Sequence, residues 1–236
     1  MKFCTPNLPK NKVKSLFVSA ILSDTIKDNL TNAGITTVIA PLCKTLRSEL
    51  KFHPDIVLHN VAKGKWLTAS EDYVNNLLIK GNVVLQDKYP LDCQYNCFIV
   101  DGVLYGGKSV ADEIKSYSNQ IITVAQGYTK CSTVILSKED YITSDITIFN
   151  ALKNNGKNVL KVTNGGIKLN GYSCGFIGGC TGVLGNKELC VTGKAELLED
   201  YQKINDFCRN IGYTIISLSN DEPYDYGGLL PITEAD

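Results

Sequence analysis

One local pattern recurs along the sequence and constrains the fold more than any other feature: a strand hairpin, a helix, a glycine and a further apolar strand. The clearest copy occupies residues 130–162. Its predicted elements are, in order, Cys131–Ser137, Tyr141–Thr143, the helix Ile146–Asn155 and Asn158–Val162. Ser144 or Asp145 suits the start of the helix, because a short side-chain oxygen accepts hydrogen bonds from free first-turn amides. Gly156 suits its end, where the backbone often turns left-handed.

Four other segments repeat the pattern with small variations. The predicted helices of these copies are Asp24–Ala33, Ser70–Lys80, Ser109–Ser118 and Ala195–Asn210. The residues that end them are Gly34, Gly81, Asn119 and Gly212, and glycine and asparagine tolerate a left-handed conformation. The strands that follow are Ile35–Ala40, Asn82–Gln86, Ile121–Ala125 and Tyr213–Leu218.

Hairpins before the helices separate this chain from an ordinary doubly wound sheet, which carries one strand before each helix. The predicted strands before the helices are Leu16–Ser19, Asp55–His59 with Trp66–Ala69, Asn96–Val100 with Val103–Tyr105, and Glu188–Thr192 in a segment that opens at Cys174. Asp101 and Gly102 form a two-residue hairpin signal. Five units in register therefore favour a repeat architecture.

The two ends of the chain indicate how the units are arranged. The first unit lacks one strand, whereas Leu229–Thr233 at the other end has no helix after it. A ring resolves both facts, because the C-terminal strand completes the first unit and leaves no mismatched end. We therefore predict an α/β propeller of five ββαβ units with pseudo-fivefold symmetry around a central channel, formed by residues 1–236 as a single domain.

Charge and composition exclude several kinds of partner. The 236 residues include 24 basic and 24 acidic side chains, and zero net charge removes the broad attraction of nucleic acids or anionic membranes, so neither is expected as a partner. We expect a cytoplasmic protein with reduced thiols, since we see neither a secretory signal nor an apolar run of membrane-spanning length. The nine cysteines form no CxxC pair and there are only two histidines, so no metal site or cofactor is predicted. The oligomeric state stays open.

A ring of five such units resembles the pentein fold of the guanidino-group-modifying enzymes. These enzymes include arginine deiminase, agmatine deiminase, dimethylarginine dimethylaminohydrolase and the amidinotransferases. The fold also includes the eukaryotic ribosome anti-association factor, which is not catalytic. More specifically, the phrases FHPDIVLHN, YNC, QGYTKCS, ITSD, GFIGGCTG and YGGLLPIT are similar to those of an uncharacterised bacterial family assigned to this fold.

The resemblance implies a cysteine that attacks the guanidinium carbon, a histidine that moves protons and carboxylates that hold a cationic substrate. In these enzymes the cysteine lies near the C-terminus, in a pattern similar to GG-x-x-C-x-T. The matching stretch begins at Gly227 and places Pro231 at the cysteine position, where proline cannot act as the nucleophile. His53, Pro54 and Asp55 are similar to the H-x-D element, which pairs the proton carrier with a substrate carboxylate.

Polar residues occupy the predicted mouth of the channel. In a ring of this kind the first strand of each unit lines the channel, and Asp55, Asn96 and Cys131 begin three of these strands. Their polar neighbours are His53, Gln126, Lys130 and Asp225. Side chains that only pack in a hydrophobic core would be apolar, so this polar set is a candidate ligand site. If the reactive site is rotated around the ring relative to that of the enzymes, Cys131 is the nucleophile. Otherwise Cys131 is a small buried residue and His53 caps a turn before Pro54.

Gly178, Gly179 and Cys180 form the other unusual stretch. Glycines allow backbone amides to approach an anion, so the loop is either a ligand cradle or a close strand crossing near the channel. Cys180 is the second thiol candidate. The stretch matches neither a Walker nor a dinucleotide-binding fingerprint.

Three functions are compatible with these residues. In the first, the channel binds a small polar or cationic ligand, with Asp55 and Asp225 supplying negative charge and Asn96 and Gln126 orienting the ligand. In the second, the protein is an atypical hydrolase or transferase for a guanidino or amidino compound, with either thiol candidate as nucleophile and His53 as base. In the third, it is a non-catalytic interaction module that uses its outer surface.

Overall fold

The structure is a computed structural model that describes residues 1–70 and 77–236. Its strands are β1 Lys2–Phe3, β2 Val13–Val18, β3 Thr36–Ile39, β4 Leu58–Ala62, β5 Lys65–Thr68, β6 Leu78–Lys80, β7 Phe98–Val100, β8 Val103–Gly106, β9 Gln120–Thr123, β10 Thr133–Ile135, β11 Asp140–Thr143, β12 Asn158–Lys161, β13 Thr181–Val183, β14 Glu188–Val191, β15 Thr214–Ser217 and β16 Leu230–Glu234. Its helices are α1 Asp24–Asn32, α2 Pro54–Val57, α3 Asp112–Lys115, α4 Ile146–Asn154, the 3₁₀ turn η1 Ala195–Leu197 and α5 Tyr201–Asn210.

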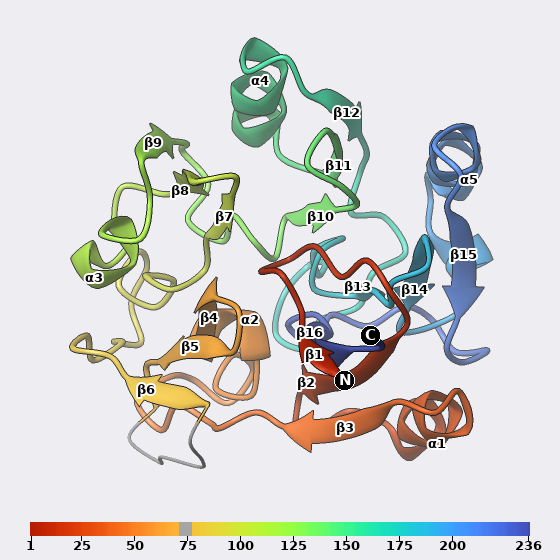
Figure 1. The fold of residues 1–236 in the computed structure, drawn as a ribbon, viewed down its shortest axis with the longest axis horizontal. Helices are drawn as coiled ribbons and strands as arrows, with labels where there is room; N and C mark the ends of the chain where they lie inside the picture. Colours follow the sequence, from red (N-terminus) through yellow and green to blue (C-terminus); the bar gives the residue numbers. More distant parts are fainter. Residues whose placement is uncertain (71–76) are drawn as a thin grey trace.

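Five small sheets stand in a ring, with α1, α3, α4 and α5 on the outside (Figure 1). The strand orders are β1-β16-β2-β3, β4-β5-β6, β7-β8-β9, β10-β11-β12 and β13-β14-β15. In each sheet an inner strand pairs antiparallel with the next strand, which then pairs parallel with an outer strand. The strand pairing of the predicted ββαβ unit therefore recurs in all five sheets.

The C-terminal strand closes the ring, as predicted. β16 lies antiparallel to β2 with Leu230 opposite Phe17, and so serves as the inner strand of the first unit. The aromatic rings of Phe17 and Trp66 meet edge to face with centroids 5.1 Å apart, which joins the closing sheet to the sheet of β4. Five apolar clusters fill the wedges between neighbouring sheets, so that each sheet packs against two others.

The fourth unit follows its prediction most closely. Asp145 begins α4, and its carboxylate accepts hydrogen bonds from the backbone N–H groups of Thr147 and Ile148 at 2.7 and 3.0 Å. Gly156 ends the unit's helix with a φ of +73°. Strong local signals at both helix ends explain the agreement, because neither depends on distant parts of the chain.

The second unit departs from its prediction. Residues 71–76 of the expected helix Ser70–Lys80 lie outside the described residues, and its last three form strand β6 instead. The expected strand Asn82–Gln86 is irregular. Gly81 does not end a helix; a Cβ there would lie 1.6 Å from the Tyr95 hydroxyl, so the position requires glycine for close approach. The short helix α2 replaces the start of strand Asp55–His59, because a proline is well suited to the first helical position.

Two helices are also shorter than predicted. The helix expected over Ser109–Ser118 is reduced to α3, since the hydroxyls of Ser116 and Ser118 donate to nearby backbone carbonyls and compete with helical hydrogen bonding. The helix expected over Ala195–Asn210 is divided into η1 and α5, because Leu198 between them is extended.

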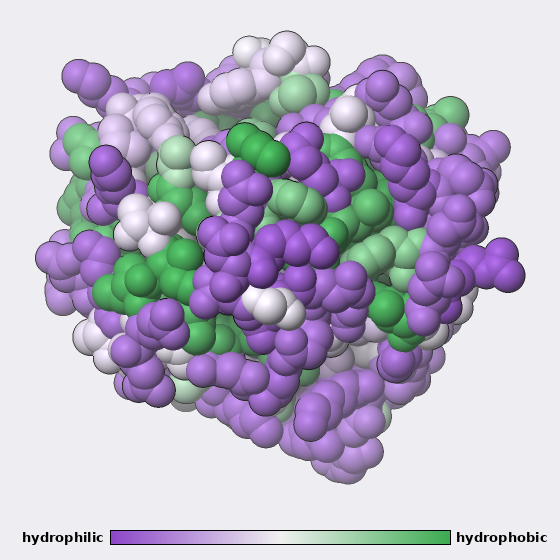
Figure 2. All heavy atoms as spheres, turned by 90° about the horizontal axis from the view of Figure 1, so that it is seen from above, coloured by the Kyte–Doolittle hydropathy of each residue, from purple (hydrophilic) through white to green (hydrophobic). Residues whose placement is uncertain are grey.

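The face shown in Figure 2 is mostly hydrophilic, with apolar side chains in smaller patches between the polar ones. Among the described residues, no helix has both the length and the apolar character needed to cross a membrane.

Candidate functional site

Helix α2 and the loop before β16 position the first functional side chain, His53. The Asp55 N–H donates to the Gly227 carbonyl at 3.1 Å, which ties the start of α2 to that loop. Gly227 has a φ of +79°, and a Cβ there would come within 2.6 Å of the His53 backbone and Cβ. Glycine is therefore required for the loop to pass against the histidine.

Asp225 lies in the same loop, and its carboxylate is held from several sides. The backbone N–H groups of Phe176 and Gly227 donate to its two oxygens at 2.8 and 2.9 Å. The Thr192 hydroxyl donates to the carbonyl of Tyr224, the preceding residue, at 2.6 Å. These contacts give the carboxylate one orientation within a fully buried site.

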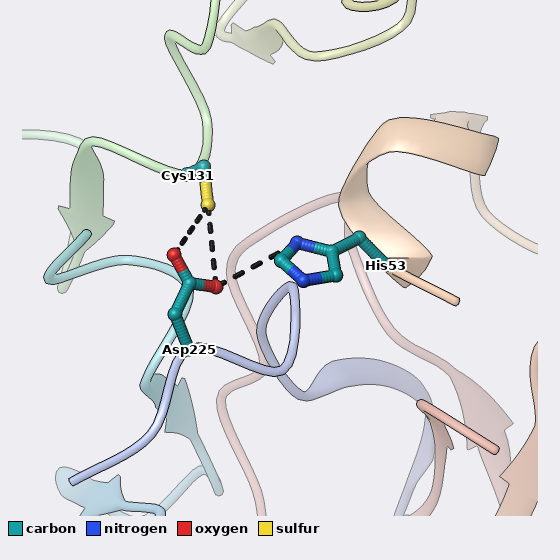
Figure 3. Close-up of side chains that lie close together, drawn as sticks. All are labelled: His53, Cys131 and Asp225. Carbon is teal, nitrogen blue, oxygen red and sulfur yellow. Dashed lines mark hydrogen bonds and ion pairs between the residues drawn. The ribbon is translucent and has the colours of Figure 1, made fainter. Parts of the chain in front are cut away.

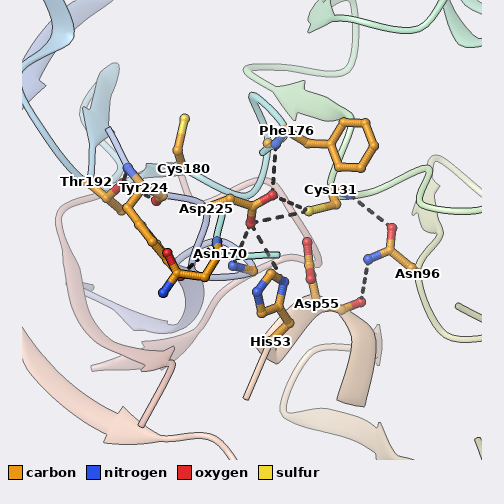
Figure 4. Close-up of polar contacts among 12 residues, drawn as sticks. His53, Asp55, Asn96, Cys131, Asn170, Phe176, Cys180, Thr192, Tyr224 and Asp225 are labelled. Atoms are coloured by element: carbon orange, nitrogen blue, oxygen red, sulfur yellow. Dashed lines mark hydrogen bonds and ion pairs between the residues drawn. The ribbon is translucent and has the colours of Figure 1, made fainter. Parts of the chain in front are cut away.

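Cys131 is placed by a buried amide bridge. The Cys131 N–H donates to the Asn96 side-chain oxygen at 3.0 Å, and the Asn96 side-chain nitrogen donates to the Asp55 carbonyl at 3.1 Å. Asn96 thereby connects the turn before β10 to helix α2, both visible in Figure 4. It acts as a positioning residue for the thiol.

The three side chains converge on one point (Figure 3). The Cys131 thiol donates to the Asp225 carboxylate, with sulfur–oxygen distances of 3.4 and 3.6 Å. The His53 Nδ1 atom lies 3.7 Å from an oxygen of the same carboxylate. All three residues are at most 2% exposed, and neither imidazole nitrogen has a hydrogen-bond partner among the described residues. Buried polar atoms without partners are costly, and they commonly mark a place that a ligand or water completes.

Burial governs the charge of the cluster. It raises the pKa of the Cys131 thiol well above its usual value, and the nearby carboxylates of Asp225 and Asp55 raise it further. Burial also raises the pKa of Asp225 to about 6, although two backbone N–H donors oppose the shift. The pKa of His53 is lowered by burial. The resting cluster therefore holds a protonated thiol and a neutral imidazole.

A cavity of about 330 Å³ opens above this cluster. His53, Cys131 and Asp225 line it together with Gln126, and its walls are largely aromatic and aliphatic. The remaining lining residues are Leu50, Ile56, Tyr89, Tyr128, Leu169, Tyr172, Ser173, Cys174 and Phe176. This volume suits a small molecule. The sequence did not indicate the aromatic wall, although Tyr128 and Phe176 lie close in sequence to predicted channel residues.

A second, smaller pocket of about 40 Å³ contains other predicted residues. Asp55 and Lys130 line it, together with His59, Asn60 and Pro231. Asp55 is 2% exposed, and burial raises the pKa of its carboxyl, which has no hydrogen-bond partner in the described part of the chain. Lys130 is half-buried, and burial lowers its pKa. Pro231, at the position of the enzymes' cysteine, therefore lines a different pocket from Cys131.

The glycine stretch serves a close strand crossing. A Cβ at Gly179 would lie 1.9 Å from a carboxylate oxygen of Asp225, and one at Gly178 would lie 2.5 Å from the Lys130 carbonyl. The Gly179 N–H already donates to the carbonyls of Cys131 and Phe176. These contacts support the crossing rather than an anion cradle.

Cys180 lies apart from the cluster. Its sulfur donates to the Ile177 carbonyl at 3.4 Å and points away from Asp225 in Figure 4. The residue is fully buried in the apolar cluster that contains Val134 and Val191. It lines neither of the two pockets.

Comparison with known proteins agrees with this architecture. Residues 17–230 match a family of unknown function, DUF6873. The fold is similar to SxtG, an amidinotransferase from Microseira wollei in the saxitoxin biosynthetic pathway, with a TM-score of 0.55 and 9% identity over 92% of this chain and 91% of that one. It is also similar to the agmatine deiminase of C. jejuni, with a TM-score of 0.55 and 13% identity over 93% and 90% of the two chains. A search of curated proteins found no match. The chain therefore has the predicted pentein fold.

Proposed function

We propose that the chain, which belongs to the family of unknown function DUF6873, binds a small guanidinium or amidinium compound and attacks it with Cys131. One observation carries the proposal: a thiol, a carboxylate and an imidazole from distant parts of the chain meet at the floor of an open cavity with largely aromatic and aliphatic walls. The solved structures of similar fold include an amidinotransferase and an agmatine deiminase, which supports this class of substrate.

The charges around the cavity favour a cation. Asp225 lies at its floor, and the buried carboxyl of Asp55 is close enough to raise the pKa of the same thiol. Tyr89, Tyr128 and Phe176 also line the cavity, and the faces of aromatic rings attract cations. A guanidinium or amidinium group at the floor would donate hydrogen bonds to the Asp225 carboxylate and relieve the cost of its burial.

The upper walls favour an uncharged tail on that cation. No arginine or lysine is among the lining residues of the cavity within residues 1–70 and 77–236. A carboxylate on the substrate would therefore lack a basic partner among the lining residues, and Arg47, which donates to the Tyr172 hydroxyl, is already paired with Asp87. We infer a preference for guanidines or amidines with an aliphatic or aromatic body over amino acids such as arginine.

The chemistry requires a thiolate, because the thiol itself is a weak nucleophile. A bound cation next to Cys131 favours the thiolate electrostatically and offsets the effect of burial. His53 accepts the thiol proton, the sulfur forms a bond to the central carbon of the amidino group, and a carbon–nitrogen bond breaks. The departing amine takes the proton from His53. Water then releases the product from sulfur in a hydrolase, or a second amine does so in a transferase.

The assignment departs from the known enzymes in the origin of the nucleophile. Their cysteine corresponds to Pro231 in β16, whereas Cys131 precedes β10 in the fourth unit. Pro231 lines the smaller pocket together with Val134 of β10, whereas Cys131 lines the larger cavity. The nucleophile proposed here therefore lies at a different place within its unit, and the site is not a copy of the enzymes' site rotated onto the fourth unit.

Binding without reaction is the second candidate function. The resting thiol donates to Asp225 and its pKa is raised well above the usual value, which is the form of a cysteine that acts only as a hydrogen-bond donor. In that case the same cavity retains the cation and no covalent step follows.

The test is an acid-quenched incubation with alkyl guanidines, alkyl amidines, agmatine and arginine, followed by peptide mass spectrometry and an ammonia assay. We expect an amidino-type adduct on the Cys131 peptide, absent from Cys131→Ser and present in Cys180→Ser. A shift in melting temperature without adduct or ammonia indicates the binding function. If no compound gives an adduct, ammonia or a thermal shift, both functions are wrong.

A further inference from the structure

The cluster of His53, Cys131 and Asp225 also has the chemistry of a metal site. Imidazole, thiolate and carboxylate are the three protein ligand types of zinc. One ligand atom from each residue lies within 4.8 Å of the others. We propose that these three side chains bind Zn²⁺, with the fourth coordination position facing the cavity. This site is independent of the amidino chemistry proposed above, although both use the same thiol.

The sulfur–oxygen distances fit a tetrahedral ion, and the nitrogen–oxygen distance is close to fitting one. Zinc bonds of about 2.0–2.3 Å at tetrahedral angles place neighbouring ligand atoms roughly 3.2–3.6 Å apart. The sulfur–oxygen distances here are 3.4 and 3.6 Å, and the nitrogen–oxygen distance is 3.7 Å. The nitrogen–oxygen distance is slightly longer than this range, so the imidazole has to move towards the carboxylate on binding.

The surroundings hold the ligands in place. Backbone N–H groups of Phe176 and Gly227 orient the Asp225 carboxylate, and the Asn96 amide fixes the backbone of Cys131. Such contacts around the ligands strengthen metal sites. One His53 nitrogen, which has no hydrogen-bond partner in the described chain, gains a coordination bond to the ion. The role of a metal ligand would explain why His53 is buried although its ring forms no hydrogen bond in the described chain.

The ligand set selects among metals. One sulfur and one nitrogen ligand favour zinc over magnesium or calcium, which prefer oxygen. Three protein ligands with an open position are typical of zinc sites that exchange water or small molecules. Binding replaces the thiol proton: the sulfur–hydrogen bond breaks, a zinc–sulfur bond forms and one proton is released to solvent. An ion in this position therefore withdraws the thiol from any amidino compound.

The first experiment needs no variant. Chelator-treated, full-length protein is titrated with ZnCl₂ against a chromophoric chelator, and Cys131 alkylation by iodoacetamide is measured by peptide mass spectrometry with and without the ion. We expect one ion per chain and slower alkylation of Cys131, with Cys174, the other thiol of the cavity, unchanged. Equal protection of both thiols, or none, would overturn the proposal.

Variants then identify the ligands. Cys131→Ser, His53→Gln and Asp225→Asn should each weaken zinc binding by at least about 10-fold, whereas Cys174→Ser should not. Circular dichroism identifies variants that fail to fold. Co²⁺ bound to the unaltered protein should give the intense near-ultraviolet band of a cobalt–thiolate bond. A cobalt spectrum without that band contradicts the site whatever the variants do. Turnover of amidino compounds by the unaltered protein is measured separately, in the presence of chelator. It does not depend on whether zinc binds, so the two proposals can fail separately.

Discussion

Cys131 and Cys180 are two buried thiols at the starts of neighbouring sheets, yet their surroundings differ completely. Cys131 precedes β10, borders the cavity and donates to the carboxylate of Asp225. Cys180 precedes β13, donates to a backbone carbonyl and packs among aliphatic side chains. Burial raises the pKa of both thiols well above the usual value. What distinguishes the candidate nucleophile is therefore access and an adjacent acid and imidazole, rather than the thiol itself.

The largest expected difference between the two thiols is in turnover of a guanidino or amidino compound. Cys131→Ser should reduce turnover by at least about 10³-fold, because a hydroxyl in this position is a far weaker nucleophile. Cys180→Ser should change it by less than about threefold, since its sulfur does not reach the cavity. Steady-state ammonia release measures both. Equal losses in the two variants would remove the distinction between the thiols.

A second test concerns the crossing that places Asp225 beside Cys131. Gly179→Ala should destabilise the fold by about 3 kcal/mol and abolish turnover, because the new Cβ would overlap the Asp225 carboxylate. Gly34→Ala is the matched control: φ is +77° and no atom lies within 4 Å of the added Cβ, so only backbone strain of about 1 kcal/mol is expected. Urea unfolding measures both. If both variants lose the same stability, the close contact does not shape the site.

The third test uses the acidity of Asp225. Its pKa is about 6 in the folded protein and about 3.9 when unfolded, so the unfolded state ionises first as pH rises. The contribution of Asp225 to the free energy of unfolding is therefore greatest below pH 4. It falls by about 3 kcal/mol in total as the pH rises from 4 to 6. His53, with its lowered pKa, has the opposite trend as pH rises towards 6.5, so the wild type alone gives a mixed profile.

Comparison with Asp225→Asn isolates the carboxyl. The free energy of unfolding of the variant minus that of the wild type should increase as pH rises from 4 to 6. Any pH-independent effect of the substitution shifts the whole curve and does not change this trend. Urea unfolding at several pH values provides the curve. A flat difference would mean that Asp225 is not the buried acid described here.

The smallest expected effect is on stability alone. Cys180→Ala should cost about 1–2 kcal/mol because it leaves a gap in a closely packed cluster, whereas Cys131→Ala should cost less than about 1 kcal/mol because its sulfur borders a cavity. Thermal unfolding compares the two variants. A greater loss in Cys131→Ala would show that Cys131 serves mainly to pack the core.

The fold was predictable where local signals are complete. The fourth unit has a capping aspartate, a helix-ending glycine and β-branched strands, and the structure reproduces all of them. The closing strand followed from a missing partner in the first unit. The second unit was mispredicted because its geometry depends on distant residues: Gly81 is required by the Tyr95 ring, and α2 is held by the Gly227 carbonyl.

The site was predictable only in part. Repeat symmetry placed Cys131, Asn96 and Asp55 near the predicted channel, and the structure brings the first two together with His53 and Asp225. Repeat symmetry did not indicate that Asp55 and Lys130 line a separate pocket, nor which aromatic side chains form the cavity wall. Those features arise from loop conformations, which strand and helix periodicity does not specify.

The proposed function requires that Cys131 reacts within a cavity that selects cations. The most direct measurement compares the labelling rates of two probes of nearly equal size, 2-chloroacetamidine, which is cationic, and 2-chloroacetamide, which is neutral. Each loses chloride as a carbon–sulfur bond forms. We predict that the amidine labels Cys131 at least about 10-fold faster than the amide, equivalent to about 1.4 kcal/mol of favourable charge interaction, and that neither labels Cys180. Equal rates for the two probes at Cys131 would mean that the cavity does not select cations.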